Sequence, residues 1–143
     1  MQKRKISQLS RTAAGGMQMV KTLTSILLTL GILISAAIFE QNFVERQFDK
    51  FATSLKVLDE KTREETAKRD DAENTRSIWE NKKKILHIVI PHNDISYVDY
   101  WLGETVSLIE TKNYETALSK IEVLLTLCKQ IPQTYKITFE NVF

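Results

Sequence analysis

The stretch from Thr22 to Phe39 reads TLTSILLTLGILISAAIF and contains no charged residue over eighteen positions. As an α-helix it is about 27 Å long, close to the ~30 Å hydrocarbon thickness of a bilayer. Its threonine and serine hydroxyls can donate to carbonyls of the same helix, so they cost little free energy in lipid. The stretch therefore predicts a membrane helix over residues 22–40. Its expected anchoring side chains are Leu23, Ile26, Leu27, Leu30, Ile34 and Phe39.

The charges on the two sides of this apolar stretch differ in sign. Residues 1–21 contain five basic residues and no acidic one, whereas residues 40–143 contain fifteen basic and eighteen acidic residues, a net charge of −3. Lys and Arg near a span are retained on the cytoplasmic side. We therefore expect a single-pass cell-membrane protein with a cytoplasmic amino terminus and an extracytoplasmic domain. Nucleic acid is not an expected partner, because the basic excess is confined to a short tail.

An alternative interpretation of the apolar stretch is a cleaved signal peptide. Ser35-Ala-Ala37 offers small residues at a cleavage site, and cleavage there would release a secreted helical module. The apolar stretch is longer than the ~7–15 residues usual in a signal peptide, which favours an uncleaved anchor.

Residues 32–90 contain neither glycine nor proline, so helix can continue beyond the membrane. We expect residues 41–76 to form a helical stalk. Apolar residues at steps of four and three form a heptad seam, which packs against helices of the same chain or, in a homo-oligomer, against a second copy. The seam comprises Val44, Phe48, Phe51, Leu55 and Leu58. Twelve of the nineteen residues in 59–77 are charged, which is typical of a stalk or of the exposed turn of a hairpin.

Residues 77–143 predict a small antiparallel helical bundle, so the expected fold class is all-α. Ser77-x-x-Glu80 is a capping-box pattern that opens one helix, which Pro91 ends. The next helix begins near His92-Asn-Asp94, where side-chain oxygens can cap it. Lys112-Asn113 joins it to a further helix in an αα-hairpin, which closes at Pro132.

One group of side chains in the sequence could carry chemistry. His87, His92 and Asp94 could hold a metal or act in acid-base catalysis, but their spacing matches no recognised ligand pattern, so a capping or buried-network role is favoured. No cofactor is expected, and a non-enzymatic protein is favoured over a ligand-sensing or hydrolytic domain that uses the His92/Asp94 turn. Cys128 is in phase with apolar neighbours, which favours a buried thiol over an intermolecular disulfide.

Three groups of residues are candidates for binding a partner, which we expect to be an envelope membrane protein. Trp79, Tyr97 and Trp101 form either a recognition surface or core anchors. A run of three lysines could bind anionic headgroups or a partner's acidic loop; the alternative is a solvated helix face. The run is Lys82, Lys83 and Lys84. Phe139, Val142 and Phe143 lie at an apolar carboxyl terminus, which docks either on the chain's own bundle or in a partner.

With this layout, the chain resembles the family called domain of unknown function 4363. The resemblance rests on an amino-terminal span, a tryptophan followed by a basic helix, a histidine-acid turn with apolar spacing behind it, a Lys-x-Tyr-x-x-Ala-Leu hairpin and the ending Glu-Asn-Val-Phe. These motifs are carried by Trp79 to Lys84, His92, Asp94, Ile95, Val98, Lys112, Tyr114, Ala117, Leu118 and residues 140–143. The chain departs from the pattern at Pro91 and Asn93.

The resemblance implies a membrane-anchored helical protein of spore-forming Gram-positive bacteria, with no assigned activity. It also implies a role beside small multi-pass envelope proteins, in sporulation. Neither implication is worked out from the residues themselves.

Overall fold

The computed structural model describes residues 2–135, and the side chains from residue 18 onward. It contains α1 (Gln2–Arg63), α2 (Arg69–Leu86), α3 (His92–Glu110) and α4 (Tyr114–Thr134), with no strand among the described residues. The all-α fold is therefore confirmed. The chain divides into two units, Met1–Phe39 and Glu40–Phe143.

The first unit is an apolar helix whose large side chains are exposed. Leu28 is 63% exposed and Leu33 is 62% exposed, as expected of a helix that has no protein to pack against. The hydroxyls bond within the helix: Thr29 Oγ1 donates to the Ser25 carbonyl at 2.9 Å, and Ser35 Oγ donates to the Gly31 carbonyl at 2.8 Å. This helix, near the amino terminus, is long and apolar enough to cross a membrane.

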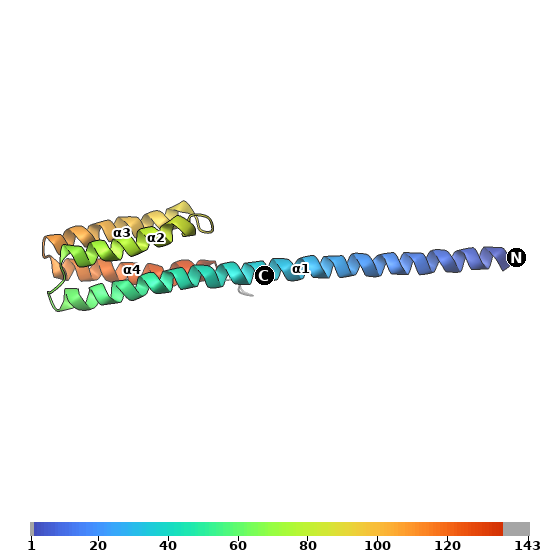
Figure 1. Cartoon of the computed structure of the whole chain (residues 1–143), viewed down its shortest axis with the longest axis horizontal. Coiled ribbons are helices and arrows are strands. Elements are labelled where there is room, and N and C mark those ends of the chain that lie inside the picture. Colours follow the sequence, from blue (N-terminus) through green and yellow to red (C-terminus); the bar gives the residue numbers. More distant parts are fainter. Residues whose placement is uncertain (1, 136–143) are drawn as a thin grey trace. The chain divides into compact units, whose positions relative to one another are not determined.

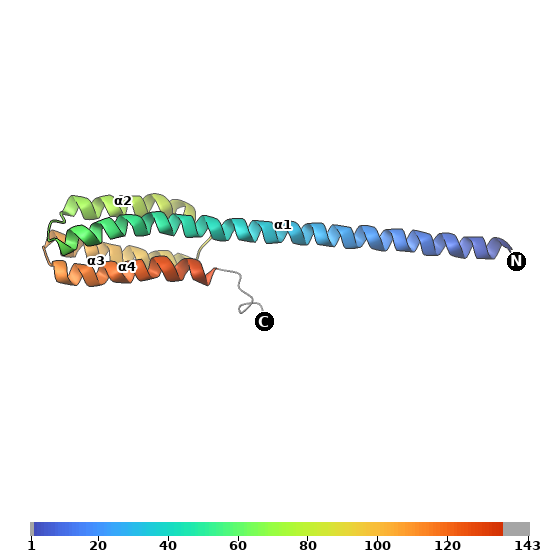
Figure 2. The ribbon, with the colours of Figure 1, turned by 90° about the horizontal axis from the view of Figure 1, so that it is seen from below.

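The second unit is an antiparallel four-helix bundle (Figures 1 and 2). The predicted heptad seam of α1 lies in its core, because each of its five side chains is at most 2% exposed. The seam therefore packs against helices of the same chain and offers no exposed surface for a second copy. Residues 41–63 are the first helix of the bundle, which corrects the prediction of a separate stalk over residues 41–76. The seam residues are Val44, Phe48, Phe51, Leu55 and Leu58.

The charged segment covers the end of α1, the turn at residues 64–68 and the start of α2, so it contains the turn that its hairpin interpretation predicted. Glu65 adopts a positive φ of 55° in this turn. The helix after it begins at Arg69, eight residues before the predicted start at Ser77. Asp71 caps this earlier start, since its carboxylate accepts a hydrogen bond from the Lys68 amide at 2.9 Å. Ala72 is fully buried, so the core-facing side of α2 already begins here.

The turn between α2 and α3 also differs from the prediction. The helix α2 ends at Leu86 and not at Pro91, and Pro91 is the N-cap residue of α3, without a side-chain cap. The Asp94 carboxylate does not cap α3 but accepts a hydrogen bond from the Tyr135 hydroxyl at 2.6 Å. Burial and this bond raise the pKa of Tyr135 to about 12. The bond therefore links the start of α3 to the residue that follows α4.

The α3–α4 connection follows the prediction more closely. Lys112 adopts a positive φ of 56°, and the Asn113 side chain accepts a hydrogen bond from the Thr116 amide at 3.3 Å. The predicted turn at Lys112-Asn113 is thus confirmed. At its other end α4 continues through Pro132, which is buried in the last turn, so the predicted stop at Pro132 falls two residues too early.

The Cys128 thiol is buried in the core of the bundle and is 6% exposed. Burial, with a smaller contribution from the Asp49 charge, raises the pKa of this thiol to about 12. Because the thiolate is the reactive form, we expect a thiol reagent at mildly alkaline pH to label the native protein at least ~100-fold more slowly than the urea-unfolded protein.

The control for this labelling prediction is Thr126→Cys in a Cys128→Ala background, because position 126 is exposed on the same helix. That variant is expected to react at the same rate in the native and unfolded states. Equal labelling rates of native and unfolded wild type would contradict the buried position of Cys128.

Candidate functional site

The Trp79 side chain is fully buried and belongs to the core. Its ring lies 4.9 Å from the Phe51 ring and 5.8 Å from the Phe48 ring, measured between centroids. Its Nε1 donates a hydrogen bond to Asp99 Oδ1 at 2.6 Å. This burial favours the core interpretation of Trp79 over the recognition-surface interpretation.

Lys83 completes this network between α2 and α3. Its ammonium group donates to Asp99 Oδ2 at 2.8 Å and to Glu80 at 3.3 Å. The bond to Asp99 is the largest cause of the raised pKa of Lys83. Of the three lysines predicted to meet a partner, Lys83 is therefore already engaged inside the domain, while Lys84 is exposed and Lys82 is half-buried.

The exposed aromatic residues of the bundle gather on one side of α3. Tyr97 is 60% exposed, Tyr100 is 59% exposed, and Trp101 is half-buried beside them. The spacing of three and four residues places these side chains on one face of the helix. They line a shallow hollow together with Asn93 and Ser96. We call Tyr97, Tyr100 and Trp101 the aromatic face.

Polar contacts from α4 hold the aromatic face in place. The Trp101 and Tyr100 rings meet edge to face at 5.1 Å, and Lys120 Nζ lies 4.5 Å from the centre of the Trp101 ring. Lys120 also pairs with Glu104 at 3.1 Å. A hydrogen bond to Glu104 raises the pKa of Tyr100, and the bonds from Tyr100 and Lys120 lower the pKa of Glu104. These contacts hold the Tyr100 and Trp101 side chains in place.

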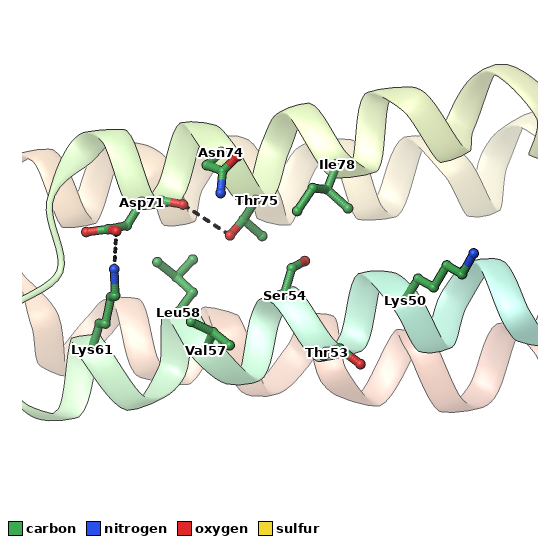
Figure 3. A pocket seen from close by; sticks show the side chains of 10 residues that line it. All are labelled: Lys50, Thr53, Ser54, Val57, Leu58, Lys61, Asp71, Asn74, Thr75 and Ile78. Atoms are coloured by element: carbon green, nitrogen blue, oxygen red, sulfur yellow. Dashed lines mark hydrogen bonds and ion pairs between the residues drawn. The ribbon is translucent and has the colours of Figure 1, made fainter.

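A second hollow lies between α1 and α2, where Val57 is 50% exposed (Figure 3). Lys61 and Asp71 form an ion pair across it, and Thr75 Oγ1 donates to the Asp71 carbonyl at 3.1 Å. The polar groups of Lys61, Asp71 and Thr75 are therefore engaged within the protein. Its volume is about 340 Å³, and its lining residues are Lys50, Thr53, Ser54, Val57, Leu58, Lys61, Asp71, Asn74, Thr75 and Ile78.

The predicted histidine cluster is only partly assembled. The His87 and His92 rings stack at 5.5 Å between centroids with an interplanar angle of 20°, and both side chains are exposed. Asp94 bonds Tyr135 and does not join them. Over the residues that the structure describes, no group of three or more His, Cys, Asp and Glu side chains is placed to hold a metal ion.

The other candidates fall into two classes. Tyr97 and Trp101 are brought together on the aromatic face, whereas Phe139, Val142 and Phe143 lie outside the described residues. Glu104 and Lys120, which contact this face, were not predicted from the sequence. The spacing of four between Tyr100 and Glu104 was a signal for the first of them. Lys120 comes from another helix, and its contact depends on how α3 and α4 pack.

This architecture defines the chain as an all-α protein, with an apolar amino-terminal helix and a four-helix bundle that carries an exposed aromatic face. Residues 38–142 match the model of the family described as Domain of unknown function (DUF4363). The chain therefore belongs to that family, as the sequence motifs indicated. No curated protein and no solved structure matches it.

Proposed function

We propose that this chain is a single-pass cell-membrane protein whose extracytoplasmic bundle binds an envelope membrane protein, as a non-enzymatic accessory or scaffold. The exposed apolar helix supports the anchoring, since its side chains need an apolar environment. The five basic residues before it, with no acidic one, support a cytoplasmic amino terminus.

The aromatic face is the observation that carries the binding proposal. Tyr and Trp are enriched among the residues that dominate binding energy at protein interfaces, because they combine large apolar area with few rotatable bonds. Here two tyrosines are about 60% exposed on a helix whose other side is buried in the core. The hydrogen bond of Tyr100 to Glu104 and the contact of Lys120 with the Trp101 ring reduce the conformational entropy that Tyr100 and Trp101 lose on binding.

The binding proposal predicts that Tyr97→Ala/Tyr100→Ala weakens capture of the partner by at least about tenfold. The measurement is quantitative pull-down of the tagged full chain from detergent-solubilised membranes, which compares the proteins retained by wild type and by variant. Both tyrosines are exposed, so the melting temperature of the bundle should change little.

The matched control for this pull-down is Ser119→Ala/Lys129→Ala, which changes two exposed residues of α4 outside the aromatic face. It should retain the same proteins as wild type. Undiminished capture by the double tyrosine variant would remove the aromatic face from the proposal.

Orientation is tested by thiol labelling of intact cells. In a Cys128→Ala background, a membrane-impermeant maleimide is expected to label Glu64→Cys, in the exposed α1–α2 turn, without permeabilisation. Ser7→Cys, in the basic amino-terminal segment, should react only after the membrane is permeabilised. The reverse pattern would contradict the proposed topology.

A further inference from the structure

The α2–α3 turn carries apolar side chains that the bundle leaves uncovered. Ile88 is 81% exposed, more than any other large apolar side chain in residues 18–135, and Ile85 is 45% exposed. Neighbours on both sides are core residues, since Leu86 is fully buried and Ile90 is 5% exposed. The turn is therefore fixed to the core through alternate residues while Ile85 and Ile88 face outward.

This turn lies at the end of the bundle that is joined to the apolar helix. Lys61 of α1 pairs with Asp71 near the start of α2, and Phe51, earlier on α1, contacts Trp79, later on α2. The two helices therefore run antiparallel, and later residues of α2 lie beside earlier residues of α1. By the same antiparallel packing, the α2–α3 turn lies at the same end of the bundle as the first bundle residues of α1. Figure 1 shows this turn at the opposite end of the bundle from the other two turns.

Few residues of the chain separate this level of the bundle from the apolar segment. Val44, the first seam residue, is about 6 Å along α1 from Glu40, the residue bonded to the last apolar residue, Phe39. The headgroup layer on one side of a bilayer is about 5–8 Å thick. Because only residues 40–43 separate Val44 from the apolar segment, the chain connection itself keeps this end of the bundle within reach of lipid headgroups.

The charge of this stretch matches an anionic lipid surface. Residues 81–93 contain three lysines, two histidines and no acidic residue. Lys83 bonds Asp99 and Glu80, but Lys82 and Lys84 form no ion pair within the part of the chain that the structure describes. Of the acidic residues at this end, Glu40 and Glu45 lie on α1, and Asp94, at the start of α3, accepts a hydrogen bond from the Tyr135 hydroxyl. Basic residues beside exposed large apolar ones are typical of segments that lie in a membrane interface.

We propose that the α2–α3 turn is a second membrane contact, in which Ile85 and Ile88 enter the interface of the bilayer that the apolar helix spans. Lys82 and Lys84 then meet the headgroups of anionic lipids. This inference rests on the proposed membrane anchoring. It makes the bundle a domain held against the bilayer at two points, the apolar helix and the turn.

The test uses the full chain in a Cys128→Ala background, reconstituted in vesicles of phosphatidylcholine and phosphatidylglycerol. A nitrobenzoxadiazole fluorophore is attached at Ile88→Cys or, as the matched control, at Glu64→Cys in the turn at the other end of the bundle. Lipids with a nitroxide near the headgroup are expected to quench the label at position 88 at least about three times more strongly than the label at position 64. Adding Lys82→Ser/Lys84→Ser, or omitting phosphatidylglycerol, should reduce that quenching.

Flotation of the vesicles separates failure of this inference from failure of the anchoring proposal. If the chain does not float with the vesicles, the anchoring proposal and this inference both fall. If it floats and the two labels are quenched equally, the anchoring stands and the second contact is overturned. Quenching at position 88 that is insensitive to both charge changes would overturn the assigned role of Lys82 and Lys84.

Discussion

Trp79→Ala is expected to lower the free energy of unfolding of the bundle by about 3–5 kcal/mol, the range found when large buried aromatic side chains are truncated. The indole is fully buried against Phe48 and Phe51, so its removal leaves a cavity where α1 and α2 meet. It also leaves Asp99 without its shortest hydrogen bond. The loss is a large fraction of the 5–15 kcal/mol that stabilises a typical domain.

Urea unfolding of the full chain in detergent, followed by far-ultraviolet circular dichroism, measures this effect. The control is Trp101→Ala, which removes an equally large but half-buried ring from the aromatic face and is expected to cost less than about 2 kcal/mol. A Trp79→Ala variant as stable as wild type would show that Trp79 does not lie in the core as described.

Leu55→Asp is expected to unfold the bundle at room temperature. Leu55 is fully buried in the middle of the seam, and an unpaired carboxylate there costs several kcal/mol. The same substitution distinguishes the two partners that the seam could have. If the seam packs inside one chain, the circular dichroism and thermal transition of the bundle are lost together.

Lys56→Asp is the matched control, because it introduces the same carboxylate at the adjacent exposed position of α1. It should change stability by less than about 0.5 kcal/mol. A Leu55→Asp variant that stays folded and changes only from dimer to monomer in light scattering would contradict the same-chain packing.

The core stripes of α1, α3 and α4 were predictable because each repeats large apolar residues at helical spacing. The start of α2 was not. Between Arg69 and Ser77 its core-facing residues are Ala72 and Thr75, small side chains that give little hydrophobic signal among charges. The same composition suits a solvated stalk or a hairpin turn. Whether these residues form a stalk or begin a helix of the bundle depends on the tertiary contacts available to them, which the local sequence does not specify.

The candidate site was predictable in part for a similar reason. Trp79 and Trp101 look alike in sequence, yet one is core and the other lines the aromatic face. Trp79 is seven residues from both Ala72 and Leu86, so it shares their buried side of α2. Trp101 is one residue before the buried Leu102 and so lies at the edge of the core stripe, where burial depends on the neighbouring helix.

The short turns of the bundle have a kinetic consequence. Because α2 packs on α3 and α3 on α4, many tertiary contacts join segments that are close in sequence. Chains with such local contacts fold in microseconds to milliseconds, since little loop entropy is lost before contacts form. A domain whose first helix carries an apolar seam benefits from this speed. The interval in which that seam could aggregate is correspondingly brief.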